Sequence, residues 1–238
     1  VVVDSAIFSP STAIVDVATA VRQLTIALER KGIPVMRDYQ VRSLKSGSNR
    51  SGFLVETDRE PLSCDQVVNC AGIGAIALRE SLGLNELSLR MVKGSYLRYG
   101  QKLAVKSLIY PLPAEDGGHL GVHSVFDVEG VVRFGPDSLG VGQLDYKMSD
   151  EVKQEMWPSI EKIFHKVRFD QLTPDFSGIR PKISYQGRPY LDFWLTGSGN
   201  NEAVSTPPGY FEACGIDSPG LTAAPAIARY LVGLIEPK

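Results

Sequence analysis

A histidine and an arginine are the residues of this sequence best suited to chemistry by their type and setting. His123 lies in a "GVHS" segment, and a histidine on a strand that lines a cleft can act as a general base. A hydrogen-bonded structural role is the equally weighted alternative. Arg180 lies between Gly178 and Pro181 in "SGIRPK". A guanidinium held on so restricted a backbone suits bidentate capture of a carboxylate, and a surface or interface salt bridge is the alternative.

A lysine and two tyrosines form a second candidate group. Lys93, Tyr96 and Tyr110 fall on expected strands, where they line a polar pocket or extend along the edge of a sheet. His119 and His123 have the spacing H-x-x-x-H, but strands and glycines surround them. The spacing therefore does not predict the helical histidine pair of a zinc site.

A glycine-rich stretch follows an apolar strand. Gly72, Gly74 and Ala77 match a relaxed G-x-G-x-x-A dinucleotide fingerprint. The acidic residue expected about 20 positions later is absent from "LSLRMVKGSYL". Contact with a cofactor, in this or another binding mode, and close packing of strand, turn and helix are both open interpretations.

The C-terminal run Gly209–Ile235 predicts a strand, a glycine turn at Ser218–Gly220 and a closing helix. Thr222 is the expected N-cap, which places Pro225 in the first helical turn. Unpaired N–H groups at a helix start attract an anion or a carbonyl oxygen, and Gly220 presents no side chain to block a ligand. An ordinary packing turn is the alternative.

The elements that must position these residues alternate in type. The fold class expected is mixed α/β and α+β, with an antiparallel block inserted into an α/β frame. The predicted elements are a surface helix over 16–30 packed on a sheet, a three-stranded meander followed by a buried strand over 66–70, an antiparallel block over 90–137, a helix over 149–164, further strands and the closing helix.

Composition restricts the function classes. A net charge of −2, a pI near 6.0 and the absence of a Lys/Arg run argue against a nucleic-acid-binding surface. Cys64, Cys70 and Cys214 show no metal-ligand spacing and are expected to be buried thiols in a reducing compartment. No apolar run is long enough to predict a transmembrane segment. The opening "VVVDSAIFSP" has no charged leader and is expected to be a chain entered partway through.

Together these segments give the sequence a family resemblance. The chain resembles the D-amino-acid-oxidase-like family of FAD-dependent oxidoreductases, most closely the branch containing L-2-hydroxyglutarate dehydrogenases. The matching segments occur in family order as "SPSTAIVD", "DQVVNCAG", "KGSYL", "IYPLP", "LGVH", "FGPD", "SGIRPK" and "GIDSPGLTAAPAIARYL".

The resemblance implies a partial FAD-binding Rossmann-like domain with an inserted antiparallel substrate domain. The expected boundaries are 1–88 for part of the FAD-binding domain with the meander, 89–195 for the substrate domain, and 196–238 for the return to the FAD-binding domain. The residues expected to border the flavin are Ala71, Gly72, Ser218, Gly220, Leu221 and Thr222.

The sequence departs from the family pattern at two places. The family's N-terminal β-α-β unit, which holds the FAD pyrophosphate, has no counterpart in it. Ala13 also replaces a usual glycine, and Ser124 and Val125 stand where a threonine is common. Three explanations are open for the missing unit: the sequence is a fragment, a separate chain supplies the N-terminal FAD-binding half, or the protein is a degenerate relative kept for structure.

The leading hypothesis is the C-terminal portion of an FAD-dependent 2-hydroxy-acid dehydrogenase, with L-2-hydroxyglutarate as an example substrate. Arg180 would pair with the substrate carboxylate, His123 would accept the hydroxyl proton, and Lys93 and Tyr110 would orient the substrate. An amino-acid oxidase of the same family and a non-catalytic subunit without FAD are the alternatives. The expected location is intracellular, mitochondrial in a eukaryote and cytoplasmic in a bacterium.

Overall fold

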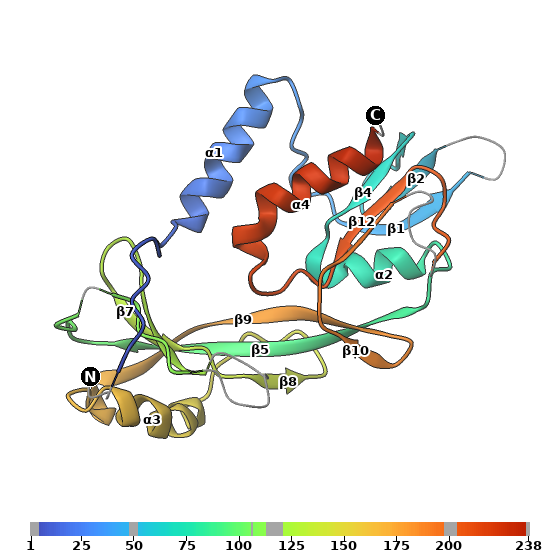
Figure 1. The fold of residues 1–238 in the computed structure, drawn as a ribbon. Helices are drawn as coiled ribbons and strands as arrows, with labels where there is room; N and C mark the ends of the chain where they lie inside the picture. The colour runs from blue at the N-terminus through green and yellow to red at the C-terminus, as the bar shows by residue number, and fades with distance from the viewer. Residues whose placement is uncertain (1–4, 48–51, 106, 113–120, 198–203, 237–238) are drawn as a thin grey trace. The chain divides into compact units, whose positions relative to one another are not determined.

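The computed structural model describes residues 5–47, 52–105, 107–112, 121–197 and 204–236. The chain divides into two compact units (Figure 1). The first unit comprises Val1–Val35 and Lys93–Ile179, and the second comprises Met36–Val92 and Arg180–Lys238. The domain boundaries expected after 88 and 195 remain predictions.

The first unit is built on antiparallel strands covered by one helix. Its strands follow the order β9-β5-β7-β6, and β8 pairs with β5. The helix α3 buries Val152, Met156 and Ile160 in a core with Leu97 and Phe134, as the helical spacing predicted. The elements are α1 (Val17–Arg30), β5 (Leu87–Tyr99), β6 (His123–Phe126), β7 (Val132–Gly135), β8 (Leu139–Val141), α3 (Glu151–Ile163), η2 (Phe169–Gln171) and β9 (Leu172–Tyr185), with β5 and β9 continuing into the second unit.

Helix α1 forms where it was expected, but its surroundings differ from the prediction. The Asp16 side chain caps it by accepting a hydrogen bond from the Thr19 amide at 3.0 Å. Its apolar residues Val17, Val21 and Leu24 are 46, 57 and 66% exposed. The expectation that this helix packs on a sheet is therefore wrong for the described residues. Helical periodicity identifies the apolar face of a helix but not what covers it.

The second unit contains the predicted meander and a separate three-stranded sheet. Strands β1, β2 and β3 pair antiparallel in sequence order. The second sheet has the order β11-β12-β4, with β12 antiparallel to β11 and parallel to β4. The elements are β1 (Val41–Ser46), β2 (Phe53–Thr57), β3 (Leu62–Cys64), β4 (Val67–Asn69), η1 (Gly72–Gly74), α2 (Ala75–Glu80), β10 (Arg188–Tyr190), β11 (Trp194–Thr196), β12 (Tyr210–Cys214) and α4 (Gly220–Ile235).

Strand β12 is buried along its whole length, which is typical of a strand covered on both faces. Phe211 lies close to Leu234 of α4, since a side-chain carbon built at Gly197 would meet both. Glu212 faces the other way and contacts Arg79 of α2. Figure 1 shows α4, in red, lying across β12 and β4. The sheet is thus placed between the two helices.

The closing helix begins earlier than its sequence predicted. It starts at Gly220 with Pro219 as N-cap, so the expected cap at Thr222 is wrong and Thr222 lies in the first turn. Pro225 is the sixth helical residue and lies inside the helix. There its missing N–H removes a hydrogen bond that an ordinary residue would donate to the Leu221 carbonyl. The turn before the helix, rather than the threonine, sets the start.

A charged cluster lies inside the second unit. Arg79 and Glu212 are both fully buried and form an ion pair, with Nε and Oε1 3.1 Å apart. Glu212 also accepts hydrogen bonds from Trp194 Nε1 at 2.9 Å, Thr196 Oγ1 at 3.0 Å and Tyr210 Oη at 2.9 Å. The Arg79 Nη1 atom binds Glu86 at 2.6 Å. Four donors on the carboxylate compensate for the cost of burying its charge.

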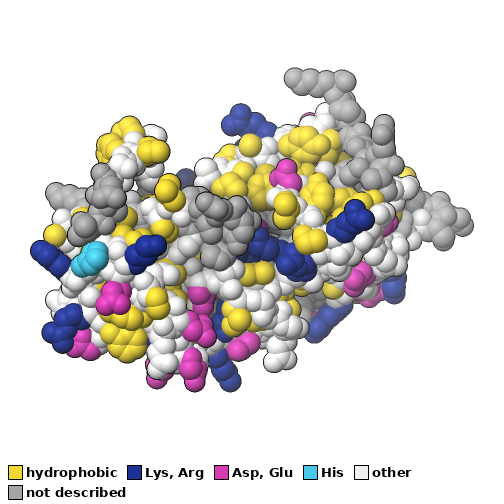
Figure 2. Space-filling model, turned by 60° about the horizontal axis from the view of Figure 1, so that its bottom comes forward, with side chains coloured by type: hydrophobic (Ala, Val, Ile, Leu, Met, Phe, Trp, Pro, Cys, Tyr) yellow, Lys and Arg dark blue, Asp and Glu magenta, His cyan; other side chains and the backbone are white. Residues whose placement is uncertain are grey.

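These observations confirm a mixed helix-and-sheet fold containing antiparallel sheets. Among the helices of the described residues, none is long and apolar enough to cross a membrane. On the face shown in Figure 2, Lys and Arg side chains are interspersed with Asp and Glu side chains.

Candidate active site

Two turns of the second unit follow neighbouring parallel strands and so lie at the same edge of the sheet. Asn69 at the end of β4 pairs in register with Glu212 near the end of β12. The chain then continues into Cys70–Gly72 after β4 and into Gly215–Gly220 after β12. The carboxyl ends of parallel strands are the usual place for a ligand in α/β sheets. Both turns were candidate ligand sites from the sequence, and the structure brings them to the same edge of this sheet.

The first turn leaves room for a ligand. Gly72 has φ of +57°, which glycine adopts without strain, and a side-chain carbon built there would meet no atom within 4 Å among the described residues. The interpretation of Gly72 as a close-packing glycine is therefore not supported. The Ala71 amide donates to Asn69 Oδ1 at 3.2 Å, and Asn69 Nδ2 donates to the Ala75 carbonyl at 2.9 Å. Asn69, which the sequence did not single out, holds this turn in place.

The second turn is packed more tightly. A side-chain carbon at Gly220 would lie 2.5 Å from Ile216 Cγ2, so Gly220 is required for packing whatever its role toward a ligand. The Gly220 amide donates to the Asp217 carbonyl at 2.6 Å. The first-turn amides of Leu221 and Thr222 belong to the group that an α-helix leaves without intrahelical partners. Ser218 precedes Pro219 through a cis peptide bond.

Arg180 contacts this second turn. Its Nε lies 3.7 Å from Asp217 Oδ1, and Lys182 Nζ lies 2.8 Å from Asp217 Oδ2. The side chain of Arg180 is 23% exposed and that of Asp217 is 17% exposed. The salt bridge weighed for Arg180 is thus present, and it joins the arginine to the glycine turn. The sequence did not identify Asp217 or Lys182, although an acid directly before "SPG" was a visible signal.

In the first unit, the rings of His123 and Tyr110 stack with their centroids 4.2 Å apart. His123 is 7% exposed, and its Nδ1 lies 3.0 Å from the Gly121 carbonyl. A carbonyl can only accept, so this contact favours the neutral tautomer that has its proton on Nδ1 and its ring lone pair on Nε2. That tautomer has the lone pair that a general base needs. Tyr110 lies in an irregular segment, so its expected place on a strand is wrong.

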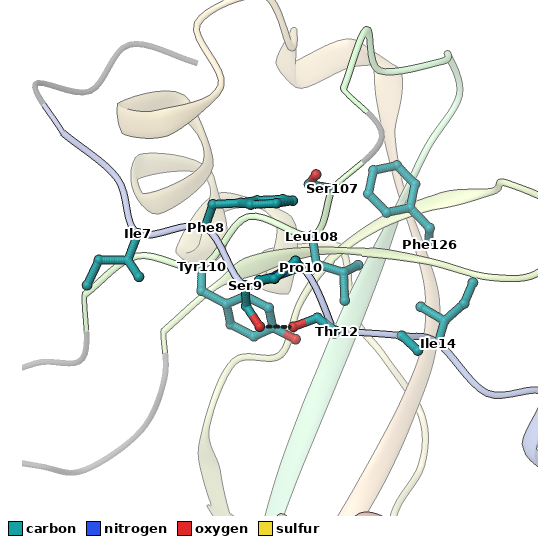
Figure 3. A pocket seen from close by; sticks show the side chains of 11 residues that line it. Ile7, Phe8, Ser9, Pro10, Thr12, Ile14, Ser107, Leu108, Tyr110 and Phe126 are labelled. Atoms are coloured by element: carbon teal, nitrogen blue, oxygen red, sulfur yellow. Dashed lines mark hydrogen bonds between the residues drawn. The ribbon is translucent and has the colours of Figure 1, made fainter.

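Tyr110 lines a cavity of about 620 Å³ within the first unit. Figure 3 shows the hydroxyl groups of Ser9, Thr12 and Tyr110 pointing toward one another, with a hydrogen bond of 2.8 Å between Thr12 Oγ1 and Ser9 Oγ. Burial raises the pKa of the Tyr110 hydroxyl, so the hydroxyl is neutral and can donate a hydrogen bond near pH 7. The lining residues are Ile7, Phe8, Ser9, Pro10, Thr12, Ala13, Ile14, Ser107, Leu108, Tyr110 and Phe126.

Lys93 lies elsewhere in the first unit. Its side chain is 7% exposed, Nζ donates to the Lys147 carbonyl, and Asp145 Oδ2 is 3.8 Å away. Lys93 is not among the residues that line the Tyr110 cavity. The structure therefore brings Tyr110 and His123 together and places Lys93 apart from that cavity. Tyr96 stacks on Phe176 with a centroid distance of 4.7 Å.

Two further predictions from the sequence concern metal ligands and the cysteines. His119 lies outside the described residues. In the described part of the chain, no group of three or more His, Cys, Asp or Glu side chains could hold a metal ion. Cys214 is buried, but Cys70 is exposed and Cys64 is intermediate, so the expectation of three buried thiols is wrong. Burial and the Glu212 carboxylate both raise the pKa of the Cys214 thiol, which makes it a poor nucleophile.

Comparison with known proteins identifies the family. The family described as "DAO: FAD dependent oxidoreductase" matches residues 2–234. The chain belongs to this family of FAD-dependent oxidoreductases. The mitochondrial L-2-hydroxyglutarate dehydrogenase of Arabidopsis thaliana is 34% identical over 183 residues, which are 69% of this chain and 36% of that protein. L-2-hydroxyglutarate dehydrogenase of Escherichia coli (strain K12) is 23% identical, covering 97% of this chain and 61% of that protein.

A solved structure of a family member shares the fold. Dithionite-reduced L-α-glycerophosphate oxidase from Mycoplasma pneumoniae, with FAD bound, aligns with a TM-score of 0.76 and 21% identity over 92% of this chain and 57% of that one. The chain therefore spans about one third to three fifths of the length of the relatives named here. The family resemblance seen in the sequence is confirmed.

The open turn at Gly72 fits the family's cofactor. A flat ring system needs to approach the backbone closely, and the space in front of Gly72 is open. The neighbouring turn at Gly220 supplies helix-start amides of α4 that could donate to a polar edge of the ring. In FAD-dependent enzymes the flavin supplies hydride acceptance, and the protein supplies binding and orientation.

Proposed function

We propose that this chain is part of an FAD-dependent dehydrogenase that oxidises a 2-hydroxy acid to a 2-oxo acid, with L-2-hydroxyglutarate as the first substrate to test. The contact of Arg180 with the Gly215–Gly220 turn carries the proposal. A guanidinium suits a carboxylate, and this contact supports a substrate site beside the turn that is proposed to border the flavin. The relatives named L-2-hydroxyglutarate dehydrogenase support the same substrate class.

In this proposal, separate groups of residues contact the flavin, bind the substrate and accept the proton. Ala71, Gly72, Ser218, Gly220, Leu221 and Thr222 border the flavin. Arg180 binds the substrate carboxylate, because two parallel N–H donors match the two carboxylate oxygens. Oxidation of the 2-hydroxy acid removes a hydride from the α-carbon and a proton from the hydroxyl. His123 accepts that proton as a general base. Tyr110 orients the substrate by donating from its hydroxyl, and the expected substrate contact of Lys93 stays a prediction.

A visible spectrum tests the proposal directly. We expect the purified protein to show flavin absorption bands at near-stoichiometric amount, and L-2-hydroxyglutarate to bleach them under anaerobic conditions. Glutamate, which has an amino group in place of the hydroxyl, serves as the comparison for amino-acid oxidation. Bleaching by glutamate alone would favour the amino-acid oxidase, and a protein that stays colourless after FAD is added would favour the non-catalytic subunit.

A substitution at the open glycine tests the flavin assignment. Gly72→Ala adds a methyl group to the open space and should weaken FAD binding at least about tenfold by keeping the ring off the backbone. The positive φ should cost about 1–2 kcal/mol of stability. Flavin affinity is measured by fluorescence quenching and stability by thermal unfolding.

Gly83→Ala is the matched control for that substitution. Gly83 lies in the same unit, has φ of +80° and also meets no atom within 4 Å of a built side-chain carbon. The Gly83→Ala variant should therefore lose about as much stability as Gly72→Ala and should keep the wild-type affinity for FAD. Equal flavin affinity in the two variants would remove Gly72 from the cofactor site.

A further inference from the structure

Asp217 lies between two cationic side chains of β9. Arg180 and Lys182 are two residues apart on this strand, so their side chains leave the same face. Each approaches a different oxygen of Asp217, Arg180 Nε at 3.7 Å and Lys182 Nζ at 2.8 Å. The lysine contact is the shorter one, and the three side chains together carry one net positive charge.

The backbone of Asp217 is fixed independently of its side chain. Its amide donates to the Gly215 carbonyl at 2.9 Å, and its carbonyl accepts from the Gly220 amide at 2.6 Å. The turn also lies tightly against β9, because a side-chain carbon at Gly215 would be 2.8 Å from Ile183 Cγ1. The backbone that carries the Asp217 carboxylate is therefore held within the turn, and the Lys182 ammonium contacts the carboxylate at 2.8 Å.

We propose that Asp217 is a positioning residue that orients Arg180 toward the substrate carboxylate. This inference rests on the proposed function, in which Arg180 binds that carboxylate. The carboxylate of Asp217 faces the Nε of the guanidinium. Holding the group from Nε leaves the two Nη atoms, which form the other edge of the planar fork, directed away from Asp217 and able to bind a second carboxylate.

Replacing Asp217 by a neutral residue should change KM in opposite directions, depending on whether Asp217 acts by orienting Arg180 or only through its charge. Asp217→Asn raises the net positive charge near Arg180, which by Coulomb attraction alone would strengthen binding of an anionic substrate and lower KM. The same change removes the group that holds the guanidinium. A long side chain must then be ordered by the substrate itself, which raises KM by about three- to tenfold. The sign of the change in KM separates the two effects.

The test is steady-state kinetics of the FAD-loaded protein with L-2-hydroxyglutarate. We expect Asp217→Asn to raise KM about three- to tenfold, with kcat within about twofold and with unchanged flavin content. Asp217→Glu restores the carboxylate and should bring KM back toward the wild-type value. Glu56→Gln is the control, since it removes one carboxylate from the exposed Lys45–Glu56 pair in the same unit and should leave KM unchanged.

A double-mutant cycle shows whether Asp217 acts through Arg180. In an Arg180→Lys background, which lacks the guanidinium fork, Asp217→Asn should add less than about twofold to KM. Full additivity of the two changes would overturn the inference, and so would a KM that falls or stays the same in Asp217→Asn. If Arg180→Lys itself leaves KM unchanged, Arg180 does not bind the carboxylate, and both the inference and that part of the proposed function fail.

Discussion

Replacing Glu212 by glutamine should lower the free energy of unfolding by about 3–5 kcal/mol, because the change leaves the buried Arg79 guanidinium without its fully buried counter-charge. Both side chains are fully buried in the second unit. Glu86 still contacts Arg79, but it is 32% exposed, and Arg79 Nη2 already has no hydrogen-bond partner among the described residues. The measurement is urea-induced unfolding followed by circular dichroism.

Two variants separate lost charge from lost packing at this position. Arg79→Met combined with Glu212→Gln removes both charges and should be more stable than Glu212→Gln alone, since no buried charge is left unpaired. Glu56→Gln makes the same chemical change at the exposed pair with Lys45 and should cost less than about 1 kcal/mol. A loss from Glu212→Gln no larger than this control would contradict the role of the buried pair.

Much of the fold follows from periodicity, because local pattern determines element type. The helix α3 and the meander of β1, β2 and β3 occur as predicted. The environment of an element is not encoded in its own pattern. The apolar stripe of α1 is exposed, and α4 starts two residues before the residue chosen as its cap. The apolar stripe of α1 identifies a face but not what covers it, and the turn before α4, rather than Thr222, sets where that helix starts.

Part of the candidate site was also visible in the sequence. Gly72 and Gly220 were predicted as site residues because each lies in a turn between an expected strand and an expected helix. The parallel pairing of β4 and β12 brings the two turns to the same edge of the sheet. Asp217 and Arg180 are far apart in the sequence, and only folding brings them together. The acidic residue Glu212 inside the apolar run "YFEAC" is a sequence signal of a buried charge. A buried acid in such a strand requires a partner.

Replacing Arg180 by alanine should lower kcat/KM for L-2-hydroxyglutarate by about 100-fold, because a charged two-point hydrogen bond to the carboxylate is worth about 3 kcal/mol. Flavin content should be unchanged. Lys182 remains 2.8 Å from Asp217, so the turn keeps an ion pair after the arginine is lost. Arg188→Ala, an exposed arginine of the same unit, is the control and should retain wild-type kinetics. Steady-state assays and visible spectra of the three proteins measure these effects.

A substrate comparison shows whether the loss in Arg180→Ala comes from the carboxylate. The substrate's 1-carboxamide analogue keeps the hydroxyl and the α-hydrogen but carries no charge on the group that Arg180 is proposed to bind. The wild-type protein should prefer the acid over this amide by about 100-fold in kcat/KM, and Arg180→Ala should reduce that preference to within about threefold. A mutation that only disturbs the fold lowers both rates together and preserves their ratio. An unchanged ratio would therefore remove Arg180 from the substrate site, even if the activity of the variant falls.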